Sequence, residues 1–149
     1  MNFNKIYPLS NNDLSLVTDL LQSFDLPVSD LEIAPAKFFG IKENRNLIAS
    51  GGLEIYGKNA ILRSVAIDKN YQGRGLGIRL THYIEAKAKE LGIKRIFLLT
   101  TTAERFFKNL DYQFIERDSC PDEIKSSAEF KEICPSTASC LYKDLTLSF

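Results

Sequence analysis

The most restrictive feature of this chain is a glycine-rich loop at residues 70–77, between a strand-like and a helix-like segment. Residues 60–68 before it are largely apolar, and after it apolar side chains recur about every 3.6 residues from Leu76 to Leu91. Glycine permits positive φ and close approach of an anion. The first amides of a helix point outward at the positive end of its dipole. The succession strand–loop–helix therefore predicts a phosphate site.

Two common phosphate motifs do not fit this loop. The P-loop pattern G-x-x-x-x-G-K-[ST] is absent. A dinucleotide fingerprint needs a third glycine, and that position holds Ile78 when counted from Gly73 and Leu80 when counted from Gly75. Arg74 offers a charge-assisted hydrogen bond to a phosphate oxygen. A glycine-rich turn that only caps a helix is the alternative that the loop leaves open.

The rest of the chain predicts one mixed domain over residues 1–149. A first helix is expected from the capping residues Ser10 and Asp13 to Pro27, and a short second helix at residues 29–32. Strands are expected at residues 37–42, 47–56, 60–68, 94–100, 112–117 and 138–145, and short later helices at 103–109 and 121–130. A meander followed by a strand–helix–strand crossover predicts an α/β (α+β) fold. Its central sheet is mixed, mostly antiparallel and flanked by helices.

Composition narrows the function classes. Lys+Arg and Asp+Glu are both 19 in 149 residues, so the chain has no overall charge that favours nucleic acid or an anionic membrane. No apolar run approaches the ~20 residues of a membrane span, and residues 1–13 do not resemble a signal peptide, so a cytoplasmic location is expected. Cys120, Cys134 and Cys140 lack metal-ligand spacing. They are expected to be free thiols, and no metal is expected.

The loop also carries a family resemblance. Gln72-Gly73-Arg74-Gly75-Leu76-Gly77 resembles the Q/R-x-x-G-x-G/A signature of the GNAT superfamily of N-acetyltransferases, and the flanking strand and helix match its context. The resemblance implies that acetyl-CoA is the cosubstrate, with its pyrophosphate held by the loop and its pantetheine arm by the preceding strand. The residues implied to bind the cofactor are Val65, Ala66, Ile67, Gln72, Gly73, Arg74, Gly75, Leu76, Gly77 and Ile78.

A narrower resemblance concerns the acceptor. Residues 51–67, 100–114 and 129–145 resemble the small acetyltransferases encoded in bacterial arsenic-resistance operons. This implies a small acceptor with a primary amine, an amino acid or a toxic amino-acid analogue, and hence a role in detoxification. No obvious surface for a macromolecular partner is visible, and a homodimer is an arrangement that the sequence leaves open.

Glu54 is our candidate catalytic base. If Lys58 and Asn59 form a two-residue hairpin turn, Glu54 faces Arg63 directly on the next strand. A structural salt bridge is the alternative reading of such a cross-strand pair. An arginine neighbour also suits a binding role better than the role of a base. We expect the fork of Arg63 to clamp an anionic group of the acceptor. The competing view is that Glu54 fully engages Arg63.

The remaining chemistry is less defined. Many members of the superfamily place a proton-donating tyrosine in the helix after the fifth strand, but the matching position here is Phe107, which cannot donate a proton. Tyr112 and Tyr142 are more typical of packing. Ser136 is a candidate hydrogen-bonding partner of the acceptor, and Cys134 has no histidine partner in view. Two other functions remain open: a non-catalytic acyl-CoA-binding sensor, and an acetyltransferase acting on protein lysines or N-termini.

Overall fold

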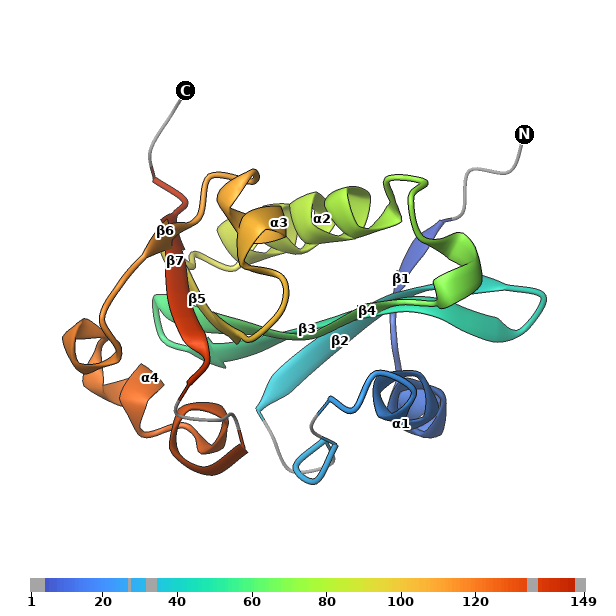
Figure 1. Cartoon of the computed structure of the whole chain (residues 1–149), viewed down its shortest axis with the longest axis horizontal. Coiled ribbons are helices and arrows are strands. Elements are labelled where there is room, and N and C mark those ends of the chain that lie inside the picture. The colour runs from blue at the N-terminus through green and yellow to red at the C-terminus, as the bar shows by residue number, and fades with distance from the viewer. Residues whose placement is uncertain (1–4, 27, 32–34, 134–136, 147–149) are drawn as a thin grey trace.

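A twisted sheet forms the centre of the protein, in a computed structural model that describes residues 5–26, 28–31, 35–133 and 137–146 (Figure 1). Within these ranges the sheet has seven strands in the order β1-β2-β3-β4-β5-β7-β6. They are β1 (Ile6–Pro8), β2 (Ala36–Glu43), β3 (Asn46–Tyr56), β4 (Asn59–Ile67), β5 (Arg95–Thr100), β6 (Gln113–Phe114) and β7 (Ser139–Asp144). Only β4 and β5 pair in parallel. The predicted mixed, mostly antiparallel sheet is confirmed.

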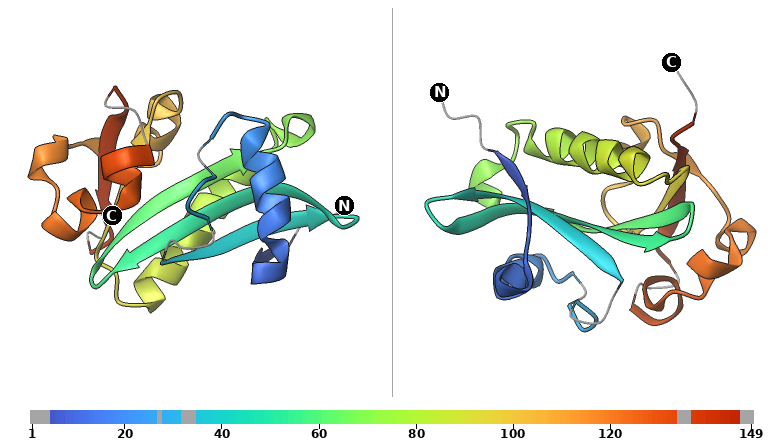
Figure 2. Two further views of the ribbon diagram at one scale, coloured as in Figure 1. Left: turned by 90° about the horizontal axis from the view of Figure 1, so that it is seen from below. Right: turned by 180° about the vertical axis from the view of Figure 1, so that it is seen from behind.

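Helices cover both faces of this sheet. Helices α2 and α3 lie on one face, and α1 lies on the other (Figures 1 and 2). The α-helices are α1 (Leu14–Gln22), α2 (Leu76–Glu90), α3 (Glu104–Lys108) and α4 (Asp122–Lys125). Short 3-10 turns occupy Asn11–Asp13, Lys69–Tyr71 and Arg117–Ser119, and a π-helical turn occupies Glu129–Ile133. In the part of the chain described, no helix combines the length and apolar character needed to cross a membrane.

Each face of the sheet has its own core. The apolar stripe of α2 packs on β3, with Leu80 and Ile84 fully buried. Gly51 in β3 makes this approach possible, since a Cβ there would lie 2.7 Å from the Ile84 Cδ1 atom. The glycine pair Gly51-Gly52 inside a strand indicates a bulge or a close backbone approach, and at Gly51 the close approach is observed. On the other face, Val17 and Leu21 of α1 are fully buried against the sheet.

Four short elements differ from the sequence-based expectation. Strand β1 was not expected. Residues 29–31 form a turn rather than a helix, with the Leu31 amide 3.3 Å from the Val28 carbonyl. The strand expected at 112–117 is limited to Gln113–Phe114, and the helix expected at 121–130 ends at Lys125. Short segments of this kind carry a weak local signal, because a helix nucleus is costly and tertiary contacts decide their state.

The β3–β4 hairpin sets the register of the site. Tyr56 pairs with Asn59, so the turn residues are Gly57 and Lys58 rather than the expected Lys58 and Asn59. The pairing therefore differs from expectation by two residues. A shift of two leaves every side chain on its expected face, because the strand period is also two.

A bulge interrupts the same pair of strands. Ser50 pairs with Ala66 and Gly52 with Arg63, so the extra residue lies on β4. The bulge thus lies opposite Gly51 of β3 and not on the strand that contains the glycines. Ser64 in the bulge has φ of 58°, an unusual conformation for a residue with a side chain. It bends β4 where the strand leaves its neighbour β5.

Candidate active site

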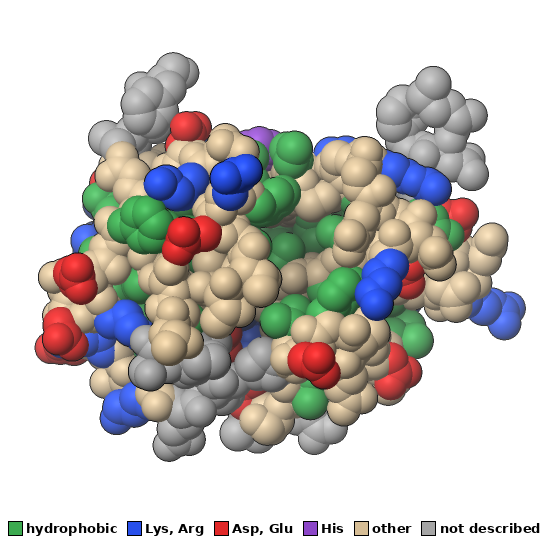
Figure 3. All heavy atoms as spheres, in the orientation of Figure 1, with side chains coloured by type: hydrophobic (Ala, Val, Ile, Leu, Met, Phe, Trp, Pro, Cys, Tyr) green, Lys and Arg blue, Asp and Glu red, His purple; other side chains and the backbone are tan. Residues whose placement is uncertain are grey.

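A cleft opens where β4 and β5 separate. The two strands pair only from Asn59–Arg95 to Ile61–Phe97, and beyond this point a cavity of about 910 Å³ lies between them. Its walls include residues 62–67 of β4, the glycine loop and start of α2, residues 98–103 at the end of β5 and just beyond it, and part of α3. Figure 3 shows hydrophobic side chains gathered in a hollow on the face in view. The cleft has the size of a site for a substantial organic ligand.

The glycine loop forms one end of this cleft. Gly73 and Gly75 both adopt left-handed backbone, with φ of 80° and 78°, and Gly75 is the N-cap of the 15-residue helix α2. A Cβ at either glycine would meet nothing within 4 Å, so the backbone is open to an approaching ligand. Both glycines line the cavity together with Gln72, Leu76, Gly77 and Ile78. The first amides of α2 therefore present an anion site toward the cleft.

Side chains stabilise the shape of the loop. The Asp68 carboxylate accepts the Asn70 amide at 2.9 Å, and the Gln72 side chain donates to the Ile67 carbonyl at 3.0 Å. Arg74 donates to the Asn70 carbonyl at 3.2 Å and stacks 5.0 Å from the Tyr71 ring. Arg74 is not among the residues that line the cavity, so its contact with a phosphate stays a prediction.

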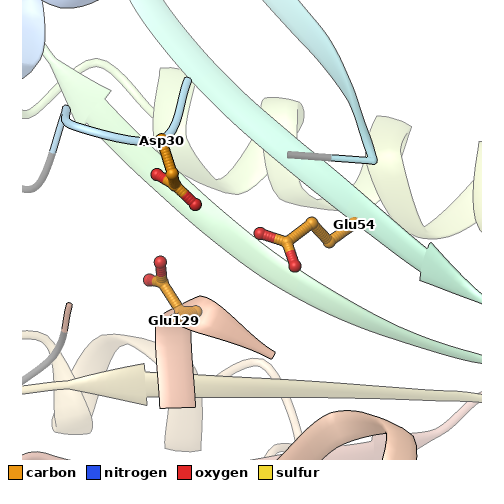
Figure 4. Close-up of side chains that lie close together, drawn as sticks. All are labelled: Asp30, Glu54 and Glu129. Atoms are coloured by element: carbon orange, nitrogen blue, oxygen red, sulfur yellow. The ribbon is translucent and has the colours of Figure 1, made fainter. Parts of the chain in front are cut away.

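A buried ion-pair cluster lies beside the β4 bulge. The Arg63 fork donates to both oxygens of Asp30, at 2.5 and 2.7 Å, and to Glu54 at 2.7 Å. Its Nε donates to the Ser64 hydroxyl at 3.0 Å, and Glu129 lies 3.6 Å from Nη1. Figure 4 shows the three carboxylates pointing toward one another. Their oxygens lie within 4.8 Å of one another, close enough to share a cation, and the Arg63 guanidinium is such a cation.

The carboxylates of the cluster favour the protonated, positively charged form of Arg63. Burial alone lowers the pKa of this guanidinium, but the hydrogen bond to Asp30, the charge of Glu129 and the hydrogen bond to Glu54 outweigh burial and raise the pKa above its usual range. Tyr56 donates to the second oxygen of Glu54 at 2.5 Å. Burial and the Glu54 carboxylate raise the pKa of Tyr56, so its hydroxyl stays protonated and continues to donate.

The predicted proximity of Glu54 and Arg63 is confirmed, although they are diagonal rather than directly opposite. The role of Glu54 as a base stays a prediction. Both its oxygens accept hydrogen bonds, its side chain is 2% exposed, and it is not among the residues that line the cavity. Arg63 does line the cavity, but its fork is already engaged, as in the competing view of this residue.

Asp30 and Glu129 complete the cluster and were not anticipated. Asp30 lies in the turn after α1, and Glu129 begins the π-helical turn before β7. Both are more than 30 residues from Arg63 in the sequence, and neither belongs to a motif. Each lies in a short segment that contains other polar or charged residues, so the local sequence offers no signal that singles it out.

The expected tyrosine position of α3 holds an apolar ring. Phe107 is buried, lines the cavity, and packs edge-on against Tyr112. Tyr112 donates to Glu85 at 2.9 Å, is 2% exposed and is not among the residues that line the cavity, so it is not placed to act as an acid there. Tyr142 stacks on Phe97. The packing roles expected for both tyrosines are confirmed, whereas Ser136 and Cys134 lie outside the described residues.

Solved structures share this architecture across the whole chain. N-acetylglutamate synthase from Neisseria gonorrhoeae, complexed with coenzyme A and N-acetyl-glutamate, superposes with a TM-score of 0.81 at 20% identity, over 97% of this chain and 36% of the synthase. An acetyltransferase of the GNAT family from Staphylococcus aureus gives 0.75 at 19% identity, over 95% and 98% of the two chains. The chain therefore shares the fold of these proteins.

Sequence comparisons identify the family to which the chain belongs. Residues 4–112 match the family described as Acetyltransferase (GNAT) family, so the chain belongs to the GNAT acetyltransferases. Amino-acid acetyltransferase from Pasteurella multocida is 30% identical over 103 residues, which is 68% of this chain and 23% of that protein. The enzyme of the same name from Ralstonia nicotianae is 30% identical over 95 residues, 62% and 21%. This chain thus spans less than a quarter of the length of these relatives.

Proposed function

We propose that this protein transfers the acetyl group of acetyl-CoA to the primary amine of a small molecule, an amino acid or an amino-acid analogue. The observation that carries the proposal is the cleft between β4 and β5, with an open helix N-terminus at one end and a buried charged cluster near the other. A phosphate-bearing thioester and a polar acceptor can enter such a cleft from opposite directions.

The loop would hold the cofactor through its backbone. The pyrophosphate accepts hydrogen bonds from the amides of residues 73–78, assisted by the dipole of α2. The pantetheine amides add as a strand to Val65, Ala66 and Ile67, since the edge of β4 that faces the cavity has no β5 partner beyond Ile61. Both contacts depend on main-chain atoms, and Gly73 and Gly75 leave the main chain of the loop open to the ligand.

The reaction itself would be a direct transfer. A neutral amine attacks the thioester carbonyl and the amine proton leaves to a base. The thiolate departs and is protonated by water or by another residue, or leaves without a general acid, since Phe107 supplies no proton. Glu54 is our candidate for this base. Holding both reactants in the cleft supplies much of the rate enhancement, because the encounter becomes effectively intramolecular.

Several observations support an amino-acid-like acceptor. The curated relatives are named amino-acid acetyltransferases, and the resemblance to arsenic-operon acetyltransferases favours toxic analogues of amino acids. Binding of an acceptor anion by Arg63 would require that anion to take the place of Asp30 on the fork. Ser136 remains the proposed hydrogen-bonding partner. From the same resemblance we propose a role in detoxification. From the composition we propose a cytoplasmic location.

The function is tested by two measurements on the full chain. Isothermal titration with acetyl-CoA measures binding, and mass spectrometry of products measures transfer to a panel of amino acids, phosphinate analogues, alkylamines and polyamines. The proposal expects binding and preferential acetylation of amino acids or their analogues. Better transfer to alkylamines would contradict the amino-acid acceptor. Binding without transfer to any amine would favour the non-catalytic sensor, for which Phe107 is the structural argument.

A further inference from the structure

We infer that the hydroxyl group of Ser64 donates a hydrogen bond to the thioester oxygen of acetyl-CoA and stabilises the negative charge that forms there when the amine attacks. This inference rests on the proposed function and adds a catalytic residue to it. Ser64 lies in the bulge of β4 and lines the cleft.

The backbone of Ser64 has an unfavourable conformation. Its φ of 58° is in the left-handed region, which a residue with a side chain rarely adopts. Such conformations cost free energy, persist where the surrounding structure holds them, and cluster at active sites. Here Ser50, which is fully buried, donates to the Ser64 carbonyl at 2.9 Å. The fold thus holds a strained residue in place in the wall of the cleft, where a bulge can re-aim its side chain.

The hydrogen bonds of Ser64 leave its proton available. A serine hydroxyl has one proton to donate and two lone pairs that accept. The Ser64 oxygen accepts from Nε of Arg63 at 3.0 Å. Within the described ranges of the chain, the Ser64 hydroxyl donates to no protein acceptor. It can therefore donate to an oxygen of a molecule that fills the cleft.

The partner of Ser64 makes this hydroxyl a stronger donor. The carboxylates around Arg63 raise the pKa of its guanidinium, so the group that donates to Ser64 is a permanent cation. A hydrogen bond from a charged group polarises the hydroxyl that accepts it and strengthens the next bond in the chain. The Arg63 fork stays on Asp30 and Glu54, while Nε brings the positive charge toward the cleft through Ser64.

The position of Ser64 along β4 matches the expected course of the cofactor. With the pyrophosphate on the amides of residues 73–78, the pantetheine arm runs back along the strand from Ile67 to Val65. Ser64 is the next residue in that direction, and it lines the same cavity. The thioester, at the end of the arm, therefore lies beside the Ser64 hydroxyl.

Other hydroxyl groups in the cleft are less suited to this role. Thr100, Thr101 and Thr102 also line the cavity, but they lie at the end of β5 and just beyond it, across from β4. The Thr100 oxygen accepts from the Ala103 amide at 2.9 Å, which is a neutral donor. A neutral donor polarises a hydroxyl less than the guanidinium beside Ser64 does.

The chemical step balances without a proton from Ser64. The amine lone pair forms the C–N bond, the electrons of the carbonyl double bond move onto oxygen, and the Ser64 hydroxyl donates to this oxyanion. The double bond forms again as the C–S bond breaks. The amine proton goes to the base and the thiolate takes up a proton, while Ser64 keeps its own. One donor to such an oxyanion contributes about 100-fold to 1,000-fold in kcat.

The test uses variants of the full chain that keep or relieve the positive φ. Ser64→Ala removes the hydroxyl at the same φ, and Ser64→Gly removes it and relieves the strain. Asn44 supplies the controls Asn44→Ala and Asn44→Gly, because it has φ of 53° in the exposed turn between β2 and β3, away from the cavity lining. Thr100→Val tests the competing hydroxyl.

Four quantities are measured for each variant: kcat, KM for the best acceptor of the panel, calorimetric affinity for acetyl-CoA, and melting temperature. Difference infrared spectroscopy with acetyl-CoA labelled with ¹³C at the thioester carbonyl reports on the proposed hydrogen bond directly. A donor to the carbonyl oxygen weakens the C=O bond and lowers its stretching frequency. This measurement needs binding of acetyl-CoA but no acceptor.

We expect Ser64→Ala and Ser64→Gly to lower kcat and kcat/KM equally, by about 100-fold. KM and the affinity for acetyl-CoA stay within about threefold of the wild type, because the interaction strengthens only in the transition state. Ser64→Gly melts no lower than Ser64→Ala, since glycine tolerates the positive φ. In both variants the carbonyl stretch of bound acetyl-CoA moves to higher frequency. The Asn44 controls keep the wild-type kcat and frequency, and Thr100→Val loses less activity than Ser64→Ala.

Three results would overturn the inference. The first is a kcat within about threefold of the wild type in the Ser64 variants. The second is an unchanged carbonyl frequency in them. The third is a loss of acetyl-CoA affinity as large as the loss of kcat/KM, which would show a structural role. If Ser64→Ala does not fold, Ser64→Gly decides each of these. A wild type that binds acetyl-CoA but acetylates no amine defeats the proposed function and the catalytic role together, whereas an active wild type with equally active Ser64 variants defeats the inference alone.

Discussion

Gly75 shows how a single backbone conformation can matter more than a side chain. Its φ of 78° places it in the left-handed region at the N-terminus of α2, with open space around its Cα. A β-branched residue there would be strained by roughly 1–2 kcal/mol. It would also place a side chain in front of the amides that face the cleft.

The first prediction concerns this residue. Gly75→Val is expected to weaken acetyl-CoA binding at least about tenfold, since one blocked set of amides removes more than 1.4 kcal/mol of binding free energy. Titration calorimetry measures the change. Gly57→Val is the matched control: Gly57 has φ of 63° and equally open space, but it lies in the β3–β4 turn away from the cavity. Equal affinity in the two variants would contradict the phosphate role of the loop.

The second prediction concerns Arg63. Arg63→Lys keeps the charge but loses the fork that joins Asp30 and Glu54, because one ammonium cannot reproduce its geometry. We expect a loss of about 3 kcal/mol in unfolding free energy, by analogy with the breaking of a buried pair, and a marked rise in the acceptor KM. Chemical denaturation and steady-state kinetics measure these two effects. Unchanged stability would show that the cluster is not held together by Arg63.

At the scale of single residues, the sequence predicts those site residues whose partners lie nearby in the chain. Gly73 and Gly75 were identifiable because their function depends on neighbours within a few residues. The pairing of Glu54 with Arg63 was identifiable because a hairpin joins them. Asp30 and Glu129 reach the same cluster through tertiary structure, and no local pattern marks them.

Among the elements, α1 shows how an N-terminal cap connects a helix to the sheet. The Asp13 carboxylate accepts from Lys42 of β2 at 2.8 Å and from the Ser10 amide at 2.9 Å. The hydrogen bond from Lys42, followed by that from Ser10, lowers the pKa of Asp13. The predicted capping pair of Ser10 and Asp13 is confirmed.

The third prediction follows from this pKa. Because the pKa of Asp13 is lower in the folded chain, its contribution to stability is present above about pH 4 and is lost as the pH falls through the folded pKa. Asp13→Asn should cost about 0.5 kcal/mol at pH 7, a value limited by solvent screening, and nothing near pH 2. Urea denaturation at both pH values measures it, with the exposed Asp19→Asn as control. A difference that persists at the lower pH would exclude the carboxylate as its cause.

Long helices and strands were predicted more accurately than short ones. Helix α2 and strands β3, β4 and β5 were predicted within a few residues, because each carries its periodicity over several turns or pairs. Strand β1 has three residues, and its formation depends on pairing with the middle of β2. The turn at residues 29–31 carried a helix-like pattern too short to nucleate.

At the scale of the whole molecule, the separation of β4 from β5 makes the stability of the fold depend on ligand binding in the cleft. The N-terminal strands and the pair β5–β7 meet through only three residue pairs before the cleft opens. A ligand that contacts both walls binds the folded chain and not the unfolded one, so it adds about 2.7 kcal/mol at a hundredfold excess over its Kd.

The fourth prediction is a rise in melting temperature of about 5–10 °C at that concentration of acetyl-CoA, as expected for a chain of this length. Differential scanning fluorimetry measures the rise. The Gly75→Val variant should show a much smaller shift at the same concentration. No shift in the wild type would mean that the cofactor does not bind in the cleft.

Because β4 separates from β5, its two edges differ beyond Ile61: one remains paired with β3, and the other faces the cavity. Some of its amides point toward β3 and stay in the ladder, whereas beyond Ile61 those that point toward the cavity have no β5 partner. In deuterated solvent, we expect the cavity-side amides of residues 62–67 to exchange much faster than their immediate neighbours in the same strand. When a cofactor adds itself as the missing strand, they should become protected. The exchange rates of the cavity-side amides in residues 62–67 therefore report whether the site is filled.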